Sequence, residues 1–303
     1  MKIIHLRIAN VSLRLLCYYF LFVTSTILVK AEFEPYQLNG GLVSAVAGRD
    51  YVVFATDTRL SSGYEILTRH HTSSRLWRVS TTKDLKRETN FWPTRVTDGA
   101  FVLSAGCQSD CEALKRQVQA EVRAHAALRA SSNLQTLSAS SIATLLGQSL
   151  YARRGFPFYS FCIVAGFDNN DNNEGGGVVH VYDAIGSHER VAVASAGSAK
   201  EMLQPILDRL FSVSNLEQGD GNAISPQQQR RGVGLLLPPV KTCVECTAEE
   251  AVEHLLRGYR AVAEREIAVG DQVLVYIMRK NGGTSKGEID GNVEVKTFDL
   301  KKH

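Results

Sequence analysis

Two pairs of cysteines have a spacing that could support metal or redox chemistry. Cys243 and Cys246 form a CxxC motif, which can be half of a zinc site or a redox pair. Zinc normally needs four ligands, and the other close pair, Cys107 and Cys111, lies far away in the sequence. A redox pair is expected at a strand-to-helix junction of a thioredoxin-like unit, which is not apparent here. We therefore interpret these cysteines as ordinary thiols.

Two further groups resemble metal sites. Residues 168–174 (DNNDNNE) are acidic, but an EF-hand calcium loop needs glycine at its sixth position and glutamate at its twelfth. Asn173 and Val179 stand there instead, so we interpret the run as a polar tip between strands. His70 and His71 are adjacent, and adjacent side chains diverge in an extended chain, which favours a solvated loop. We predict no metal and no cofactor.

Motifs of the common hydrolases do not occur. The sequence has no GxSxG, no HExxH and no phosphate-binding glycine loop, so a serine or metal hydrolase has no support. Residues 194–198 (ASAGS) are small and lead into a predicted helix, where backbone amides could face an anion. Because no nucleophile is nearby, we interpret this segment as a strand-to-helix turn.

Composition describes an ordinary globular chain. Its 303 residues, 44% hydrophobic and 21% charged, suffice for one large domain or two small ones. A net charge of +3 without a long basic run gives no reason to expect a nucleic-acid partner. The cysteines are scattered and form no disulfide framework, so a reducing compartment is the default. Besides the two pairs above, they are Cys17 and Cys162.

The N-terminal residues resemble a targeting segment rather than part of a globular domain. Lys2 and Arg7 precede an apolar run from Leu15 to Val29, which is followed by Ala31. This pattern resembles a secretory signal, and it is short for a membrane span of about 20 apolar residues. We treat residues 1–35 as a hydrophobic leader or N-terminal extension.

Hydrophobic periodicity predicts strands, two helices, strands, two helices and strands again. Two capping boxes, Ser198 with Glu201 and Thr247 with Glu250, predict the starts of the later helices. This order favours two packed sheets covered by helices on both outer faces. The predicted strands cover residues 42–47, 51–57, 100–104, 161–167, 178–182, 190–194, 272–278 and 293–298, and the earlier helices cover residues 110–129 and a segment capped by Ser140 or Ser141.

Two segments do not fit this pattern. Residues 75–95 show no clear period, so we predict an exposed loop or insertion there. Residues 213–239 are rich in Gln, Gly and Pro and read as a surface insertion within one domain, residues 36–303.

Several motifs, in this order along the chain, resemble proteasome core particle beta subunits. Residues 39–42 (NGGL) and 55–63 (ATDTRLSSG) resemble the opening of the beta-type domain. Residues 150–157 (LYARRGFP), 163–168 (IVAGFD) and 196–208 (AGSAKEMLQPILD) resemble the beta type-1 branch, which holds the sixth position of the beta ring. The resemblance runs from about residue 36 to the C-terminus, interrupted by the two insertions.

The resemblance implies an α+β fold, the four-layer αββα sandwich of N-terminal nucleophile hydrolases. In that family, removal of a propeptide after a glycine exposes a threonine whose free α-amine, with a pKa of about 8, accepts the hydroxyl proton. Counting back from Asp57, which matches the family's aspartate, places the nucleophile position at Gly41. Since glycine has no side chain, the resemblance implies a subunit that does not cleave peptides.

The supporting residues of that chemistry have changed as well. The family's lysine falls at or near Ser73, and Arg75 could only imitate its charge. A later aspartate and serine are replaced by Glu266 and Val269. Asp57 and Arg59 are then expected to remain as fold residues with buried hydrogen bonds. We predict no catalytic residues.

We therefore expect a non-catalytic structural subunit of the particle that degrades proteins in an ATP- and ubiquitin-dependent way, in the cytoplasm and nucleus. Its partners would be the other alpha and beta subunits of the stacked heptameric rings.

Two alternatives stay open. One is an active N-terminal nucleophile hydrolase that uses Thr24, Thr26 or Ser44. The other is a membrane-anchored or secreted sandwich-fold binding module, which the leader would favour. The leader itself is a retained extension, the product of a wrongly chosen start codon, or a real signal.

Overall fold

The computed structural model describes residues 36–72, 75–79, 95–96, 100–128, 137–168, 176–217, 243–280 and 291–300. All structural statements below concern these residues. The predicted leader lies outside them, and its assignment stays a prediction.

In chain order the strands before α2 are β1 (Leu42–Ala47), β2 (Tyr51–Asp57), β3 (Leu60–Ser62), β4 (Glu65–Thr68), β5 (Leu76–Val79), β6 (Arg95–Val96) and β7 (Ala100–Gly106). The remaining elements are α2 (Gln108–Leu128), α3 (Ala139–Ala152), β8 (Ser160–Phe167), β9 (Gly177–Tyr182), β10 (His188–Arg190), β11 (Val193–Gly197), α4 (Lys200–Glu217), α5 (Ala248–Ala263), β12 (Gln272–Arg279) and β13 (Gly291–Asp299).

Two antiparallel sheets organise the described chain. The first has six strands in the order β11-β1-β2-β12-β13-β6, and the second has five in the order β10-β9-β8-β7-β5. A separate two-stranded sheet, β3-β4, extends beyond the end of β2. Every residue of β1 and β2 is buried, which agrees with their continuous apolar sequences.

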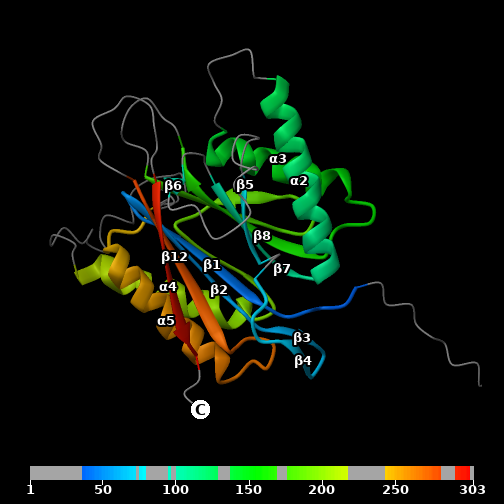
Figure 1. Ribbon diagram of the computed structural model, residues 1–303. Helices are drawn as coiled ribbons and strands as arrows, with labels where there is room; N and C mark the ends of the chain where they lie inside the picture. The colour runs from blue at the N-terminus through cyan, green and yellow to red at the C-terminus, as the bar shows by residue number, and fades with distance from the viewer. Residues whose placement is uncertain are drawn as a thin grey trace, which may run out of the picture. The chain divides into compact units, whose positions relative to one another are not determined.

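Helices cover both outer faces (Figure 1). One buried cluster joins the six-stranded sheet to α4 and α5, and another joins the five-stranded sheet to α2 and α3. A third cluster fills the space between the two sheets, where Phe54 stacks on Tyr276 with ring centroids 5.3 Å apart. The predicted α+β sandwich of four layers, αββα, is therefore confirmed.

Local sequence explains two elements that frame the site. β1 pairs with β2 from Val43 opposite Thr56 to Ala47 opposite Val52, so the short turn between them sets the register. α5 begins with the predicted capping box, in which the Thr247 hydroxyl accepts from the Glu250 amide and the Glu250 carboxylate accepts from the Thr247 amide. Both predictions are confirmed.

Five local predictions are wrong. The single strand predicted at residues 190–194 is divided, because β10 ends at Arg190 and β11 begins at Val193. Residues 76–79 form the buried strand β5, not an exposed loop, because they pair with β7; residues 80–94 lie outside the described part. α3 is capped by Ser138 rather than Ser140 or Ser141. α4 runs to residue 217, so residues 213–217 are helical; the rest of the predicted insertion at 213–239 lies outside the described residues and stays a prediction. The fifth error, the helix cap predicted at Ser198, is described with the site below.

Candidate functional site

The site is built around Gly41, the residue before β1. Its backbone has φ +94°, a conformation that L side chains rarely adopt. Its amide donates to the carbonyl of Ala268 at 3.3 Å, and its carbonyl accepts from the amide of Ser198 at 3.0 Å. The Ser198 hydroxyl also donates to the Gly41 carbonyl, at 3.3 Å. The Ser198 hydroxyl therefore hydrogen-bonds to Gly41 rather than capping α4, and the capping box predicted there with Glu201 is wrong.

Asp57, at the end of β2, lies fully buried below this point. Its carboxylate accepts from the Leu42 amide at 2.9 Å and from the Gly270 amide at 3.4 Å. Burial raises the pKa of Asp57 to about 6, although the nearby Arg75 and the two amides oppose the shift. Asp57 thus fixes the start of β1, which agrees with its expected role as a fold residue.

Arg75 occupies the space in which a side chain of residue 41 would lie. It is 2% exposed, and a Cβ built on Gly41 would lie 0.8 Å from its Nη1 atom. The guanidinium donates to the carbonyls of Gly40 at 2.9 Å, Arg59 at 2.7 Å and Asn39 at 3.4 Å. Its Nη1 lies 4.0 Å from the Asp57 carboxylate. A positive charge therefore lies next to Gly41, and a side chain at 41 would require the guanidinium of Arg75 to move.

The other residues weighed for catalysis do not converge here. Ser44 is completely buried in β1, and its hydroxyl donates to the Tyr259 hydroxyl at 3.2 Å. Val269 is buried in the core, and the Glu266 carboxylate accepts from the Ala268 amide in its own turn. Ser73, Thr24 and Thr26 lie outside the described residues.

Residues 36–40, which we call the N-terminal strap, enter the site from the side opposite β1. The amide of Asn39 donates to the Gly106 carbonyl at 3.0 Å, and its carbonyl accepts from the Ser61 amide at 3.2 Å. The Asn39 side chain donates to the Ser61 carbonyl at 3.2 Å and accepts from the Gln108 amide, the first of α2, at 2.9 Å. The chain before Gly41 is therefore hydrogen-bonded to β3 on one side and to the end of β7 and the start of α2 on the other.

A charged clamp lies next to this site. Asp271 has φ 63°, and its carboxylate accepts two hydrogen bonds from Arg59, at 2.8 and 3.0 Å. Arg69, beyond the end of β4, donates to the same carboxylate at 2.7 Å. The hydrogen bond from Arg59 is the main reason that the pKa of Asp271 is lowered. The clamp ties the β3-β4 hairpin to the loop before β12.

Comparison with known proteins identifies the family to which this sequence is similar. The family model described as proteasome subunit matches residues 78–224. The proteasome subunit beta type-1 of Drosophila melanogaster is 32% identical over 271 residues, which are 89% of this chain and 91% of the relative. The same subunit of Petunia hybrida is 33% identical over 84% of this chain and 93% of its own length. A probable proteasome subunit beta type-6 of Schizosaccharomyces pombe is 30% identical over 90% and 99%.

The chain belongs to the proteasome subunit family. Its similarity to beta type-1 subunits extends over most of its length, as the motifs in the sequence indicated. The family forms a threonine-type peptidase complex, so membership implies assembly with other proteasome subunits.

The remaining candidate residues have local structural contacts. The Asp168 carboxylate accepts from the amide and hydroxyl of Ser140, at the start of α3. The amide of His71 donates to the Thr58 carbonyl, and burial, with Arg75 nearby, lowers the pKa of His71. Ser195, in the small-residue segment, donates to Gln204. In the described part of the chain, the cysteines form no disulfide.

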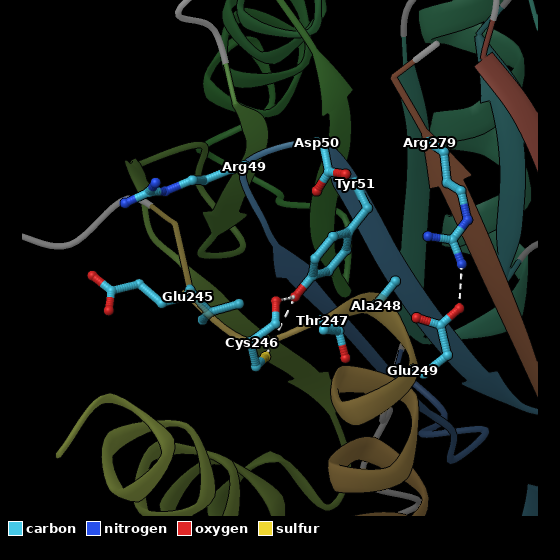
Figure 2. Close-up of a pocket in the computed structure, with 10 residues that line it drawn as sticks. Arg49, Asp50, Tyr51, Glu245, Cys246, Thr247, Ala248, Glu249 and Arg279 are labelled. Carbon is cyan, nitrogen blue, oxygen red and sulfur yellow. Dashed lines mark hydrogen bonds and ion pairs between the residues drawn. The ribbon is translucent and has the colours of Figure 1, made fainter. Parts of the chain in front are cut away.

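A cavity of about 330 Å³ lies at the opposite end of β1 from Gly41 (Figure 2). The Tyr51 hydroxyl donates to the Cys246 carbonyl at 2.7 Å, and Arg279 pairs with Glu249 across the opening. The amides of Thr247 and Glu250, at the start of α5, are engaged in the capping box. Because these polar groups bond to one another, we assign no chemistry to this cavity. None of the described helices is long and apolar enough to cross a membrane.

Sequence reasoning missed the full role of Arg75, Asn39 and Asp271. Arg75 was weighed only for its charge, because its side chain cannot be placed from spacing across a loop. Asn39 precedes two glycines with positive φ, which is a recognisable turn signal, but its contacts with Ser61 and Gln108 are tertiary. Asp271 gave no local signal beyond being an acidic residue after a glycine.

Proposed function

We propose that this chain is a non-catalytic subunit of the proteasome core particle. In this role it contributes by packing to the beta ring that encloses the proteolytic chamber, in the cytoplasm and nucleus. Neighbouring subunits of the stacked heptameric rings would carry out ATP- and ubiquitin-dependent protein degradation. The chain would supply part of the chamber wall and the ring contacts, but no nucleophile.

One observation carries the non-catalytic part of this proposal. By the count from Asp57, Gly41 stands at the nucleophile position, and the guanidinium of Arg75 fills the space that a side chain there would need. A threonine-type mechanism needs a side-chain hydroxyl as its nucleophile, and residue 41 has no side chain to supply one.

The test uses tagged full-length chain purified from its own cells. Mass spectrometry would identify the co-purifying proteins and the mature N-terminus, and an electrophilic probe that acylates N-terminal threonine would report nucleophiles. We expect other alpha and beta subunits to co-purify, and we expect the probe to label some of these partners but not this chain.

Three results would contradict the proposal. Labelling of this chain would show an active nucleophile, and a mature N-terminus at Thr24, Thr26 or Ser44 would identify it. A solitary chain that begins near residue 32 would instead support a secreted module. A chain recovered in membrane fractions without other subunits would support an anchored one.

A further inference from the structure

Large hydrophobic side chains are exposed where α3 ends. Tyr151 is 57% exposed and Phe156 is 64% exposed. Ile185, in the turn between β9 and β10, is 45% exposed. This turn lies against the end of α3, because a Cβ built on Gly186 would be 3.1 Å from the amide nitrogen of Tyr151. Single exposed hydrophobic side chains are common, whereas a group of them on adjoining segments indicates a contact surface.

Two arginines lie among these side chains. The guanidinium carbon of Arg153 is 4.7 Å from the ring centroid of Phe158, and that of Arg154 is 4.5 Å from the ring centroid of Tyr151. A guanidinium that lies over a ring keeps N–H groups available for acceptors. Within the described part of the chain, neither arginine forms an ion pair with a carboxylate. The end of α3 therefore presents two charged donors that have no acidic partner there.

Backbone hydrogen bonds and ring stacking hold this segment in one shape. The amide of Arg154 donates to the carbonyl of Tyr151 at 3.1 Å. The amide of Phe156 donates to the carbonyl of Arg153 at 2.9 Å. The ring of Phe156 also stacks on that of Tyr36, with centroids 5.5 Å apart. A surface that is ordered before binding loses less conformational entropy when a partner docks.

The charge of this surface selects the kind of partner. Residues 150–157 (LYARRGFP) hold two positive charges and no acidic residue. Asp183, in the adjoining turn, accepts hydrogen bonds from the amides of Ile185 and Ser187 at 3.0 and 2.8 Å, so its carboxylate is used within that turn. Arginine and aromatic side chains are enriched in protein interfaces, and a guanidinium pairs bidentately with a carboxylate. Charge complementarity therefore favours an acidic protein segment, since two cations without a basic run give little affinity for nucleic acid.

We propose that Tyr151, Arg153, Arg154, Phe156 and Ile185, which we call the α3-end patch, dock an acidic segment of another subunit of the particle. Carboxylates of that segment pair with the two arginines, and apolar side chains beside them cover the two aromatic rings. This inference rests on the proposed function, because it takes the partner to be another subunit. It adds the position and the chemistry of one contact.

The experiment places a photoreactive benzophenone side chain at position 151 of the tagged full-length chain, in the complex purified from its own cells. After irradiation, mass spectrometry identifies the cross-linked peptides. We expect a peptide of another subunit with Asp or Glu beside the attachment site. Cross-links only within this chain, cross-links to segments without acidic residues, or no cross-links would each overturn the proposal.

Charge reversal then tests the arginines. Arg153→Glu combined with Arg154→Glu should lower the yield of this cross-link by about tenfold or more, because like charges would face each other. Arg116→Glu combined with Arg123→Glu makes the same charge change at two exposed positions of α2 and should leave the yield unchanged. Equal yields in all three chains would overturn the role of the arginines, and so would equal losses in the two double variants.

A charge swap decides the case in which the doubly reversed patch is not recovered in the complex. The acidic residues found by cross-linking are then changed to lysine in the partner. Restored recovery or cross-linking supports the docking, and no restoration refutes it.

The same purification separates this inference from the proposed function. If other subunits co-purify but position 151 cross-links to no acidic segment of them, only the docking proposal fails. If no proteasome subunits co-purify, the proposed function fails as well, whatever the cross-link shows.

Discussion

A double-mutant cycle between Gly41 and Arg75 tests the central geometry most directly. In Gly41→Ala, the new Cβ would lie 0.8 Å from Nη1 of Arg75, so the guanidinium must leave its place. It would then lose its two shortest hydrogen bonds, at 2.9 Å to Gly40 and 2.7 Å to Arg59. Each such bond to a charged donor contributes about 1.5–3 kcal/mol, so the two together give roughly 3–6 kcal/mol. Positive φ adds about 1–2 kcal/mol for alanine.

The cycle separates these two costs. With Arg75→Ala as the background, Gly41→Ala should cost only the backbone strain of about 1–2 kcal/mol, so the coupling energy should be roughly 3–6 kcal/mol. Pulse proteolysis in urea measures the folded fraction of the full-length chain in each of the four variants. Equal costs of Gly41→Ala in both backgrounds would show that Arg75 does not occupy this space, and the reasoning about the site would fail with it.

Three further predictions concern the groups around the site and one helix start. Because the pKa of Asp57 is raised to about 6, the native state binds this proton more tightly than the unfolded state does. As the pH rises from 4 to 6, the free energy of unfolding should therefore fall by up to about 3 kcal/mol relative to Asp57→Asn, as measured by urea titrations at each pH. Asp271→Asn keeps a residue that tolerates φ 63° but removes the charge facing Arg59, so it should lower the free energy of unfolding by about 2 kcal/mol at pH 7. At acid pH the effect should be much smaller, because wild-type Asp271 is then protonated and no longer stabilises the fold through its charge. Thr247→Ala should cost about 1 kcal/mol in thermal or urea unfolding because α5 loses its cap, whereas Thr247→Ser should be close to wild type.

The four layers could be predicted from the sequence because each element carries its own periodic signal. The buried strands β1 and β2 are continuous apolar runs, and the capping box of Thr247 and Glu250 marks the start of α5 in the sequence. The short β1-β2 hairpin could be predicted too, and it places the start of β1, next to Gly41, beside Asp57 at the end of β2.

The rest depends on contacts that no local pattern encodes. Arg75 follows a loop whose length hides its alignment, and only the fold shows that its side chain reaches Gly40. Ser198 has the sequence of a helix cap, yet its hydroxyl bonds to Gly41, a residue 157 positions away in the chain. A tertiary acceptor here outweighs the local preference for a capping box.

The glycine, the arginine and the strap depend on one another. Gly41 leaves the space that the guanidinium of Arg75 fills, and the carbonyls of Asn39 and Gly40 provide two of the acceptors that a buried guanidinium needs. Those acceptors stay in place only while the strap remains attached before Gly41. A side chain at position 41 would therefore displace Arg75, weaken its hold on the strap and lower stability. Accommodating such a side chain requires a change at residue 75 as well.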